Sequence, residues 1–193
     1  ITDGEETTLV KTLVVGCQNS VIPADVKIIG KGAFQGSRLL KSITIPNGVT
    51  IIEDEAFTGC VSLQQIGIPN SVTKIGDFAF AECLELYRVI FDNNDSQLQI
   101  IGQEAFSNCC AYPPIEGTTG FVIPHNVTSI GKGAFYGAGF DRVSYNGTID
   151  DYLQIKIAEG LSDDDPYTDQ DFRIYYLDPN SDVPPYVLPK GLK

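Results

Sequence analysis

The sequence of 193 residues contains no methionine, no tryptophan and a single histidine, His125. It also lacks a Gly-x-Ser-x-Gly turn, a phosphate-binding loop and a His-Glu-x-x-His pair, so the usual nucleophilic and zinc-dependent mechanisms lack the residues they require. His125 stands two residues before Val127, in a position that Asn47 and Asn70 fill elsewhere, and this predicts an exposed turn. We therefore predict that the protein is not an enzyme and uses no cofactor.

Long apolar runs and basic residues are also scarce. No apolar stretch approaches the roughly 18 residues that a membrane-spanning helix needs. Lysine and arginine number 13 against 25 aspartates and glutamates, which gives a formal net charge of −12. Such a chain is poorly suited to nucleic acid, whose phosphates need a basic surface, or to electrostatic docking on anionic lipid. We predict no nucleic-acid partner and no membrane insertion in this segment, and we ascribe the acidity to solubility rather than to a cationic partner.

Neither end of the chain shows a targeting signal. The absence of a secretion signal at Ile1 and of any methionine predicts a mature or trimmed segment. Residues 187–193 follow the pattern of residues 44–50, so a further repeat starts there. Two interpretations remain open: the parent protein continues, or this coil is a cap.

What the sequence does contain is a repeat. An Ala-Phe pair recurs at Phe34, Phe57, Phe80, Phe106 and Phe135, with two equal steps followed by two longer ones. An isoleucine stands four residues before each alanine, and an aliphatic residue stands three before that isoleucine. Self-similarity at about 20–29 residues with fixed apolar positions is typical of a leucine-rich solenoid. We expect each phenylalanine to stack on those of the neighbouring coils, while the small alanine leaves room for the adjacent backbone.

The repeat unit also resembles a known family. Residues 40–46 read Leu-Lys-Ser-Ile-Thr-Ile-Pro and are followed by Val49, Ile52, Ala56-Phe57 and Cys60. This unit resembles that of the BspA-like (Treponema-type) leucine-rich repeat family of bacterial surface proteins, over roughly residues 13–143. The expected fold is a leucine-rich repeat solenoid, α/β by convention but β-rich, with right-handed coils, a parallel concave sheet and an irregular C-terminal cap. The resemblance implies a secreted or cell-surface protein that binds extracellular or host matrix proteins in adhesion.

The period divides the chain into three parts. Residues 1–21 form a lead-in and a capping strand, residues 22–145 form about five to six repeats, and residues 146–193 form a degenerate repeat or cap. Within the last part, residues 150–157 predict a short helix with an acidic first turn, and residues 172–177 predict a strand. Glycines at four equivalent positions, Gly30, Gly76, Gly102 and Gly131, predict a tight bend. Glu53 replaces this glycine in the second copy, so the bend needs no positive φ.

Cys60, Cys83 and Cys109 share one register and are expected to line up on successive coils. Their Cα atoms would then be about 5 Å apart, which is within disulfide range. Ser37 and Ala138 fill the same position in the flanking copies, and their small size favours a row of buried free thiols. The cysteine spacing does not match a zinc site.

Candidate binding residues are the outward positions of the concave strands. This face carries tyrosine and arginine, which are enriched at interface hot spots. The candidates are Lys41, Thr44, Gln64, Gln65, Tyr87, Arg88 and Arg142, in rows that also contain Ser42, Gly67, Ile90 and Ser144. An ordinary solvated sheet face is the alternative. Three extra residues near 92–96 and six near 110–120 predict surface loops, either tolerated or part of a binding face.

Two further hypotheses stay open from the sequence. The chain could be a glycan-binding or accessory module of a larger extracellular protein. A pocket lined by Tyr87, Tyr112, Tyr136 or Tyr145 would favour that function. The acidic stretch 163–171 could bind Ca²⁺ through its carboxylates, but it does not match the EF-hand loop, and a solvated acidic loop is the simpler interpretation.

Overall fold

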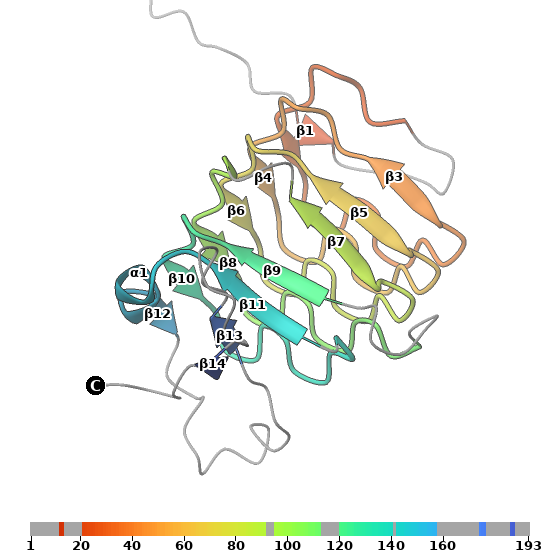
Figure 1. Ribbon diagram of the computed structural model, residues 1–193. Helices are drawn as coiled ribbons and strands as arrows, with labels where there is room; N and C mark the ends of the chain where they lie inside the picture. Colours follow the sequence, from red (N-terminus) through yellow and green to blue (C-terminus); the bar gives the residue numbers. More distant parts are fainter. Residues whose placement is uncertain are drawn as a thin grey trace, which may run out of the picture.

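The computed structural model describes residues 12–13, 21–91, 95–112, 120–140, 142–157, 174–176 and 186–187. The chain winds into a solenoid whose successive coils add strands to two stacked sheets (Figure 1). The front sheet contains β3 (Ser42–Thr44), β5 (Gln65–Ile68), β7 (Arg88–Phe91), β9 (Gly120–Pro124), β11 (Arg142–Asn146), β13 (Ile174–Tyr176) and β14 (Tyr186–Val187). All of its pairs are parallel except that between β13 and β14. The predicted repeat solenoid with a parallel sheet is confirmed.

A second parallel sheet lies behind the first and was not predicted. It contains β1 (Thr12–Leu13), β2 (Ile28–Ile29), β4 (Ile51–Ile52), β6 (Lys74–Ile75), β8 (Ile100–Ile101), β10 (Ser129–Ile130) and β12 (Lys156–Ile157). These strands have two residues each, and every strand from β2 to β12 ends on an isoleucine that is in register with the next. Two residues are too few to show the alternation that marks a strand.

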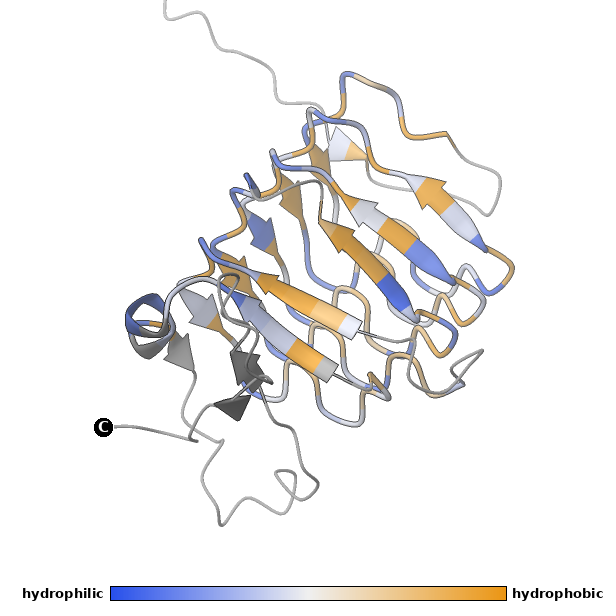
Figure 2. Cartoon of the chain, viewed as in Figure 1, coloured by the Kyte–Doolittle hydropathy of each residue, from blue (hydrophilic) through white to orange (hydrophobic). Residues whose placement is uncertain are grey.

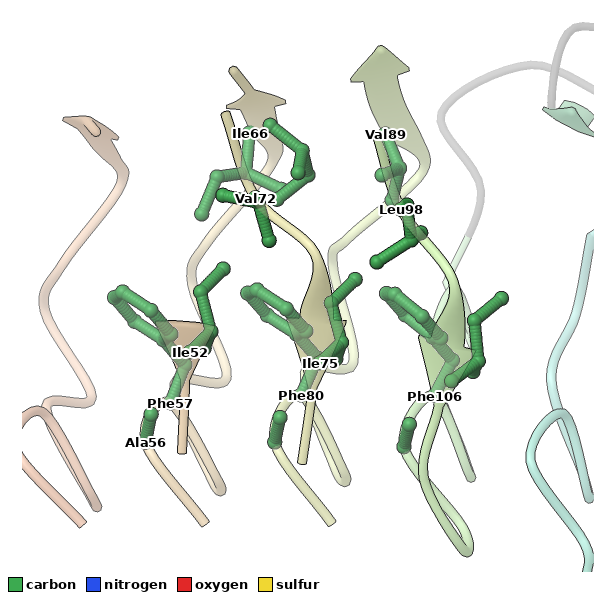
Figure 3. Packing of buried hydrophobic residues seen from close by; sticks show 14 of the residues in the cluster. Ile52, Ala56, Phe57, Ile66, Val72, Ile75, Phe80, Val89, Leu98 and Phe106 are labelled. Carbon is green, nitrogen blue, oxygen red and sulfur yellow. The ribbon is translucent and has the colours of Figure 1, made fainter. Parts of the chain in front are cut away.

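Between the sheets, phenylalanine rings form a ladder through the core. Adjacent rings from Phe34 to Phe135 have centroids 4.9, 5.1, 5.2 and 5.6 Å apart and planes within 9° of parallel. Figure 3 shows three of these rings beside the matching row of isoleucines. Every ring, and the alanine before it, is buried. The expected stacking is therefore confirmed, and it places one aromatic side chain in the middle of each coil.

The turn around each Ala-Phe pair has a left-handed backbone at two places. One is the residue before alanine and the other lies two residues after phenylalanine. Some coils use glycine there, and others use Glu55, Phe78, Glu82, Glu104 and Asn108, with φ between 48° and 60°. Amides of this turn donate to the next coil, as in Phe57 N–H to Ala79 O at 2.7 Å and Phe80 N–H to Ala105 O at 2.8 Å. These inter-coil bonds hold side-chain-bearing residues in a conformation that costs about 1–2 kcal/mol each.

The four repeated glycines serve close packing rather than the predicted tight bend. None of them has a positive φ, as the sequence indicated. A Cβ atom at Gly76 would lie 2.5 Å from Asp54 N, and one at Gly102 would lie 2.5 Å from the carbonyl carbon of Gly76. At these four positions the neighbouring coil approaches so closely that a Cβ atom would clash, whereas the second coil accommodates Glu53 at the equivalent position.

After β11 the chain forms a short helix and then a further strand of the back sheet. Helix α1 (Ile149–Leu153) begins at a capping box, in which Thr148 and Asp151 satisfy each other's backbone amides. Its first turn is acidic, as predicted, but the helix stops at Leu153 and does not extend to residue 157. Lys156–Ile157 instead forms β12, because Ile157 continues the isoleucine row of the back sheet.

Candidate functional site

The predicted binding residues lie in three rows across the front sheet. Backbone bonds join Lys41, Gln64 and Tyr87 in the first row. Strand register aligns Ser42, Gln65, Arg88, Gly120 and Arg142 in the second, and Thr44, Gly67 and Ile90 in the third. Lys41, Thr44, Gln64, Gln65 and Arg88 are exposed and Tyr87 is half-buried, whereas the side chain of Arg142 lies outside what the structure describes. Ser144 was predicted to face outward in the third row, but it is buried.

The front sheet splits between β7 and β9. β5 and β7 pair over four residues and β9 and β11 over five, but β7 and β9 share one pair, Arg88 with Gly120. Beyond that pair the two parallel strands have no common register, and their arrows diverge in Figure 1. The step along the chain from Arg88 to Gly120 exceeds the regular step from Gln65 to Arg88 by the combined length of the two insertions. Both insertions therefore belong to one enlarged coil, and that coil forms the split.

A cavity of about 500 Å³ occupies the split, and we call it the β7–β9 groove. It is lined by Tyr87, Arg88, Val89, Ile90, Phe91, Ser96, Gly120, Val122, Pro124, His125 and Asn146. Its volume lies within the range of roughly 300–1,000 Å³ that is usual for a ligand site. Tyr87 and Arg88 lie at the end where the strands meet. At the far end, His125 directly follows β9 and Asn146 is the last residue of β11, so the groove has a polar group at each end.

The middle of the groove is apolar. Ile90 and Val122, one from each strand, are each 42% exposed, and Figure 2 colours most of β7 and β9 as hydrophobic. Beneath them the ring of Phe91 meets the ring of Phe121 edge-on, with centroids 5.6 Å apart. Phe121 occupies the row that Ile66 and Val89 fill in regular coils. Its ring is fully buried and packs on the rings of Phe106 and Phe135, with centroids 4.8 Å from each.

Sequence reasoning missed several lining residues. His125 was predicted in an exposed turn, but it is half-buried at the groove, and its carbonyl accepts a hydrogen bond of 2.9 Å from the hydroxyl of Tyr145. Asn146 stands at the end of β11, in register with Pro124. The combined length of the two insertions was the available signal, because both lie between β7 and β9 along the chain.

The tyrosines give limited support to a glycan site. Tyr87 lines the groove. Tyr145 is buried, and burial, followed by the nearby Asp151, raises its pKa to about 12. Tyr112 and Tyr136 are 69% and 40% exposed and do not line the groove. One of the four candidate tyrosines is therefore in place.

The cysteine row consists of buried free thiols, as the small residues in the flanking copies favoured. The Sγ atoms of Cys60, Cys83 and Cys109 donate to the carbonyl oxygens of Phe34, Phe57 and Phe80, at 3.2, 3.2 and 3.0 Å. Each thiol thus bonds to the backbone of the preceding coil. Burial, and then the neighbouring Cys83, raise the pKa of Cys60 to about 12, and burial also raises the pKa of Cys83 well above its usual value.

We expect these thiols to make stability fall at alkaline pH. An unfolded thiol ionises near pH 8.5, while Cys60 in the folded chain keeps its proton to about pH 12. The thiol contribution is therefore complete below about pH 8.5 and is lost as the pH rises toward 12, because the unfolded chain releases its protons first. Melting temperatures between pH 7 and 10.5 should decline more steeply for the parent than for Cys60→Ser/Cys83→Ser. Parallel declines would contradict this assignment.

Other candidate chemistry receives no structural support. The acidic stretch 163–171, proposed as a possible calcium loop, lies outside the described residues. Within the described ranges, no group of three histidine, cysteine, aspartate or glutamate side chains is arranged to hold a metal ion. No helix in the same ranges is long and apolar enough to cross a membrane.

Comparisons with known proteins agree with this architecture. A family model described as BspA type leucine-rich repeat region, in six copies, matches residues 15–116 and 115–152. A T. pallidum leucine-rich repeat protein of known structure is 31% identical, over 64% of this chain and 56% of that one, with a TM-score of 0.55. A leucine-rich cell surface protein from Faecalibacterium prausnitzii is 24% identical, over 65% of this chain and 38% of that one, with a TM-score of 0.46. The chain thus spans about half or less of these proteins. No curated protein matches the sequence.

Proposed function

Because the chain belongs to the BspA-type leucine-rich repeat family, we propose that it is a non-catalytic module that binds extracellular proteins through its front sheet. The proposal includes display on a bacterial surface or secretion, and adhesion to host matrix proteins or neighbouring cells. The resemblance of the repeat unit to those of bacterial surface proteins supports this location. Repeat proteins commonly bind along such an extended sheet.

The β7–β9 groove is the observation that carries this proposal. It interrupts an otherwise regular sheet and places an aromatic residue and a cation, Tyr87 and Arg88, beside exposed apolar side chains. Tyrosine and arginine in a partly apolar depression are typical of the energetic centre of a protein interface. The exposed Lys41, Thr44, Gln64 and Gln65 extend the face along the solenoid. Many weak contacts along this face would be strengthened by displaying several copies.

Glycan binding is the second candidate function. The position of Tyr87 in a groove with polar groups at both ends favours it. A sugar ring can stack on an exposed aromatic face while its hydroxyls bond to arginine and amide groups. The groove offers one such aromatic residue, so we rank protein binding first.

We expect Tyr87→Ala/Arg88→Ala to weaken binding to a matrix-protein ligand by at least about 30-fold, because truncation of a hot-spot residue costs about 2 kcal/mol or more. The measurement is surface plasmon resonance against a panel of immobilised matrix proteins and, separately, polysaccharides. Tyr112→Ala/Arg38→Ala is a matched control, because it removes the same residue types from exposed positions outside the groove. The proposal fails if the groove variant binds as tightly as the parent, and binding to polysaccharides alone would select the second candidate.

A further inference from the structure

The split leaves two strand edges facing each other inside the front sheet. On its other side, β7 pairs with β5 along all four of its residues, and β9 pairs with β11 along all five. Toward the groove, the register of both strands stops after Arg88 and Gly120. Among the residues that the structure describes, 89–91 and 121–123 therefore have no ladder partner in that direction. Such an edge is a template on which another extended chain can form backbone hydrogen bonds.

The side chains along the groove define what an added strand would carry. At the closed end, Arg88 is exposed, and no carboxylate pairs with it among the residues that the structure describes. In the middle, the exposed apolar side chains of Ile90 and Val122 lie on opposite edges of the groove, and the rings of Phe91 and Phe121 lie beneath them. The order is thus a cation, then an apolar section, then the polar His125 and Asn146.

We infer that the β7–β9 groove binds an extended peptide segment of a partner protein as an added strand, with an acidic side chain against Arg88 and an aliphatic side chain between Ile90 and Val122. This inference rests on the proposed protein-binding function and names the chemistry of the partner. At about 3.3 Å per residue, the open edge accommodates a segment of roughly three to four residues. The backbone edges supply affinity to any sequence, and the side-chain positions supply selectivity.

An extended peptide fits these observations better than a glycan does. Peptide backbone offers a donor and an acceptor at each residue in the spacing that an unpaired strand edge requires. A hydroxyl-rich sugar would leave the side chains of Ile90 and Val122 in contact with water, whereas an aliphatic side chain would cover them. A carboxylate on the partner would also neutralise the cation at the closed end.

The inference can be tested with a displayed library of random heptapeptides. The library is selected on the whole chain after removal of peptides that bind Val122→Trp, a variant in which the indole fills the groove. Ile90→Trp blocks the groove from the opposite strand, and Val21→Trp is the matched control because Val21 is exposed outside the groove. Circular dichroism melts establish that each variant is folded. The selected peptides should combine an acidic residue with alternating aliphatic residues.

Synthetic forms of the best peptide then separate backbone from side-chain recognition. N-methylation of alternate amides should raise the Kd at least about tenfold, because it removes the donors that pair with the strand edge. Arg88→Gln should weaken the acidic peptide about tenfold and leave its glutamine form almost unchanged. Both tryptophan blocks should abolish binding, while Val21→Trp retains it.

Three results would overturn the inference: no peptide that prefers the parent over Val122→Trp, equal affinity after N-methylation, or groove-dependent binding of a polysaccharide without any enriched peptide. The matrix-protein assay keeps this test separate from that of the proposed function. If Tyr87→Ala/Arg88→Ala loses matrix binding but no peptide binds the parent chain, only the inference of an added strand fails. Peptide binding without any matrix partner would count against adhesion alone.

Discussion

Phe80→Ala is expected to lower the free energy of unfolding by about 3–5 kcal/mol, which is the usual cost of removing a buried aromatic ring. Phe80 is fully buried, and its ring stacks on both Phe57 and Phe106 at 5.1 and 5.2 Å. The substitution removes both contacts and leaves a cavity in the middle of the solenoid. Because each coil is stabilised by its neighbours, the loss should also weaken cooperation between the two halves of the array. Guanidinium unfolding followed by circular dichroism measures the effect.

Phe34→Ala is the matched comparison for this prediction. Phe34 is equally buried but stacks on one ring, that of Phe57 at 4.9 Å. We expect it to cost less than Phe80→Ala, and we expect Phe80→Leu to cost less than either, because leucine restores part of the lost volume. Equal losses at the two phenylalanines would show that stability in this solenoid is not distributed through neighbour contacts.

The core could be predicted from the sequence because its positions repeat. Every residue that fixed the period, such as Val49, Ile52 and Phe57, is buried, and the three cysteines lie in one row. A side chain that must meet its own equivalent in the next coil is restricted in size and polarity, and the restriction recurs at each turn. Because the same restriction recurs in five copies, the core positions can be recognised in the sequence without any knowledge of the fold.

The backbone of the turns could not be predicted in the same way. Glu55, Phe78 and Glu82 adopt a positive φ although none of them is glycine or asparagine. Their conformation is imposed by bonds to the next coil, such as Phe80 N–H to Ala105 O, which exist only once the coils are stacked. The conformational preference of glycine therefore led to the wrong prediction that Gly30, Gly76, Gly102 and Gly131 form the turn.

The β7–β9 groove was not predicted, because the repeat period was counted from one phenylalanine to the next. Counted at phenylalanine, the two insertions fall into successive steps, one on each side of Phe106, and they suggest two modest loops in separate repeats. The phenylalanines lie midway between front strands, so this count divides one enlarged coil into two. Counted along the front sheet, the whole surplus lies between Arg88 and Gly120, and both insertions act on the same pair of strands. The candidates Tyr87 and Arg88 were named for residue type, and the split gives them a location that Lys41, Thr44, Gln64 and Gln65 lack.

Gly102→Ala is expected to lower the free energy of unfolding by about 2–3 kcal/mol, although it adds one methyl group, because overpacking that displaces the backbone is costly. The new Cβ would lie 2.5 Å from the carbonyl carbon of Gly76 and 2.6 Å from Asp77 N, so backbone atoms would have to move. The clash lies among inter-coil bonds: Asp77 N–H donates to Asp54 Oδ1 at 2.9 Å, Gly102 N–H to Ile75 O at 2.9 Å and Gln103 N–H to Asp77 Oδ1 at 2.8 Å. Overpacking of this kind costs about 1–3 kcal/mol, and here it also stretches bonds on both sides.

Gly67→Ala separates this steric effect from the conformational one. Gly67 lies on β5 in the front sheet, and a Cβ atom there would meet nothing within 4 Å. We expect its unfolding free energy to stay within about 0.5 kcal/mol of the parent, or to rise slightly because alanine restricts the unfolded chain. Chemical denaturation of both variants measures the difference. If the two substitutions cost the same, close contact between coils is not what requires glycine at Gly30, Gly76, Gly102 and Gly131, and the spacing of the solenoid must be set by the core side chains alone.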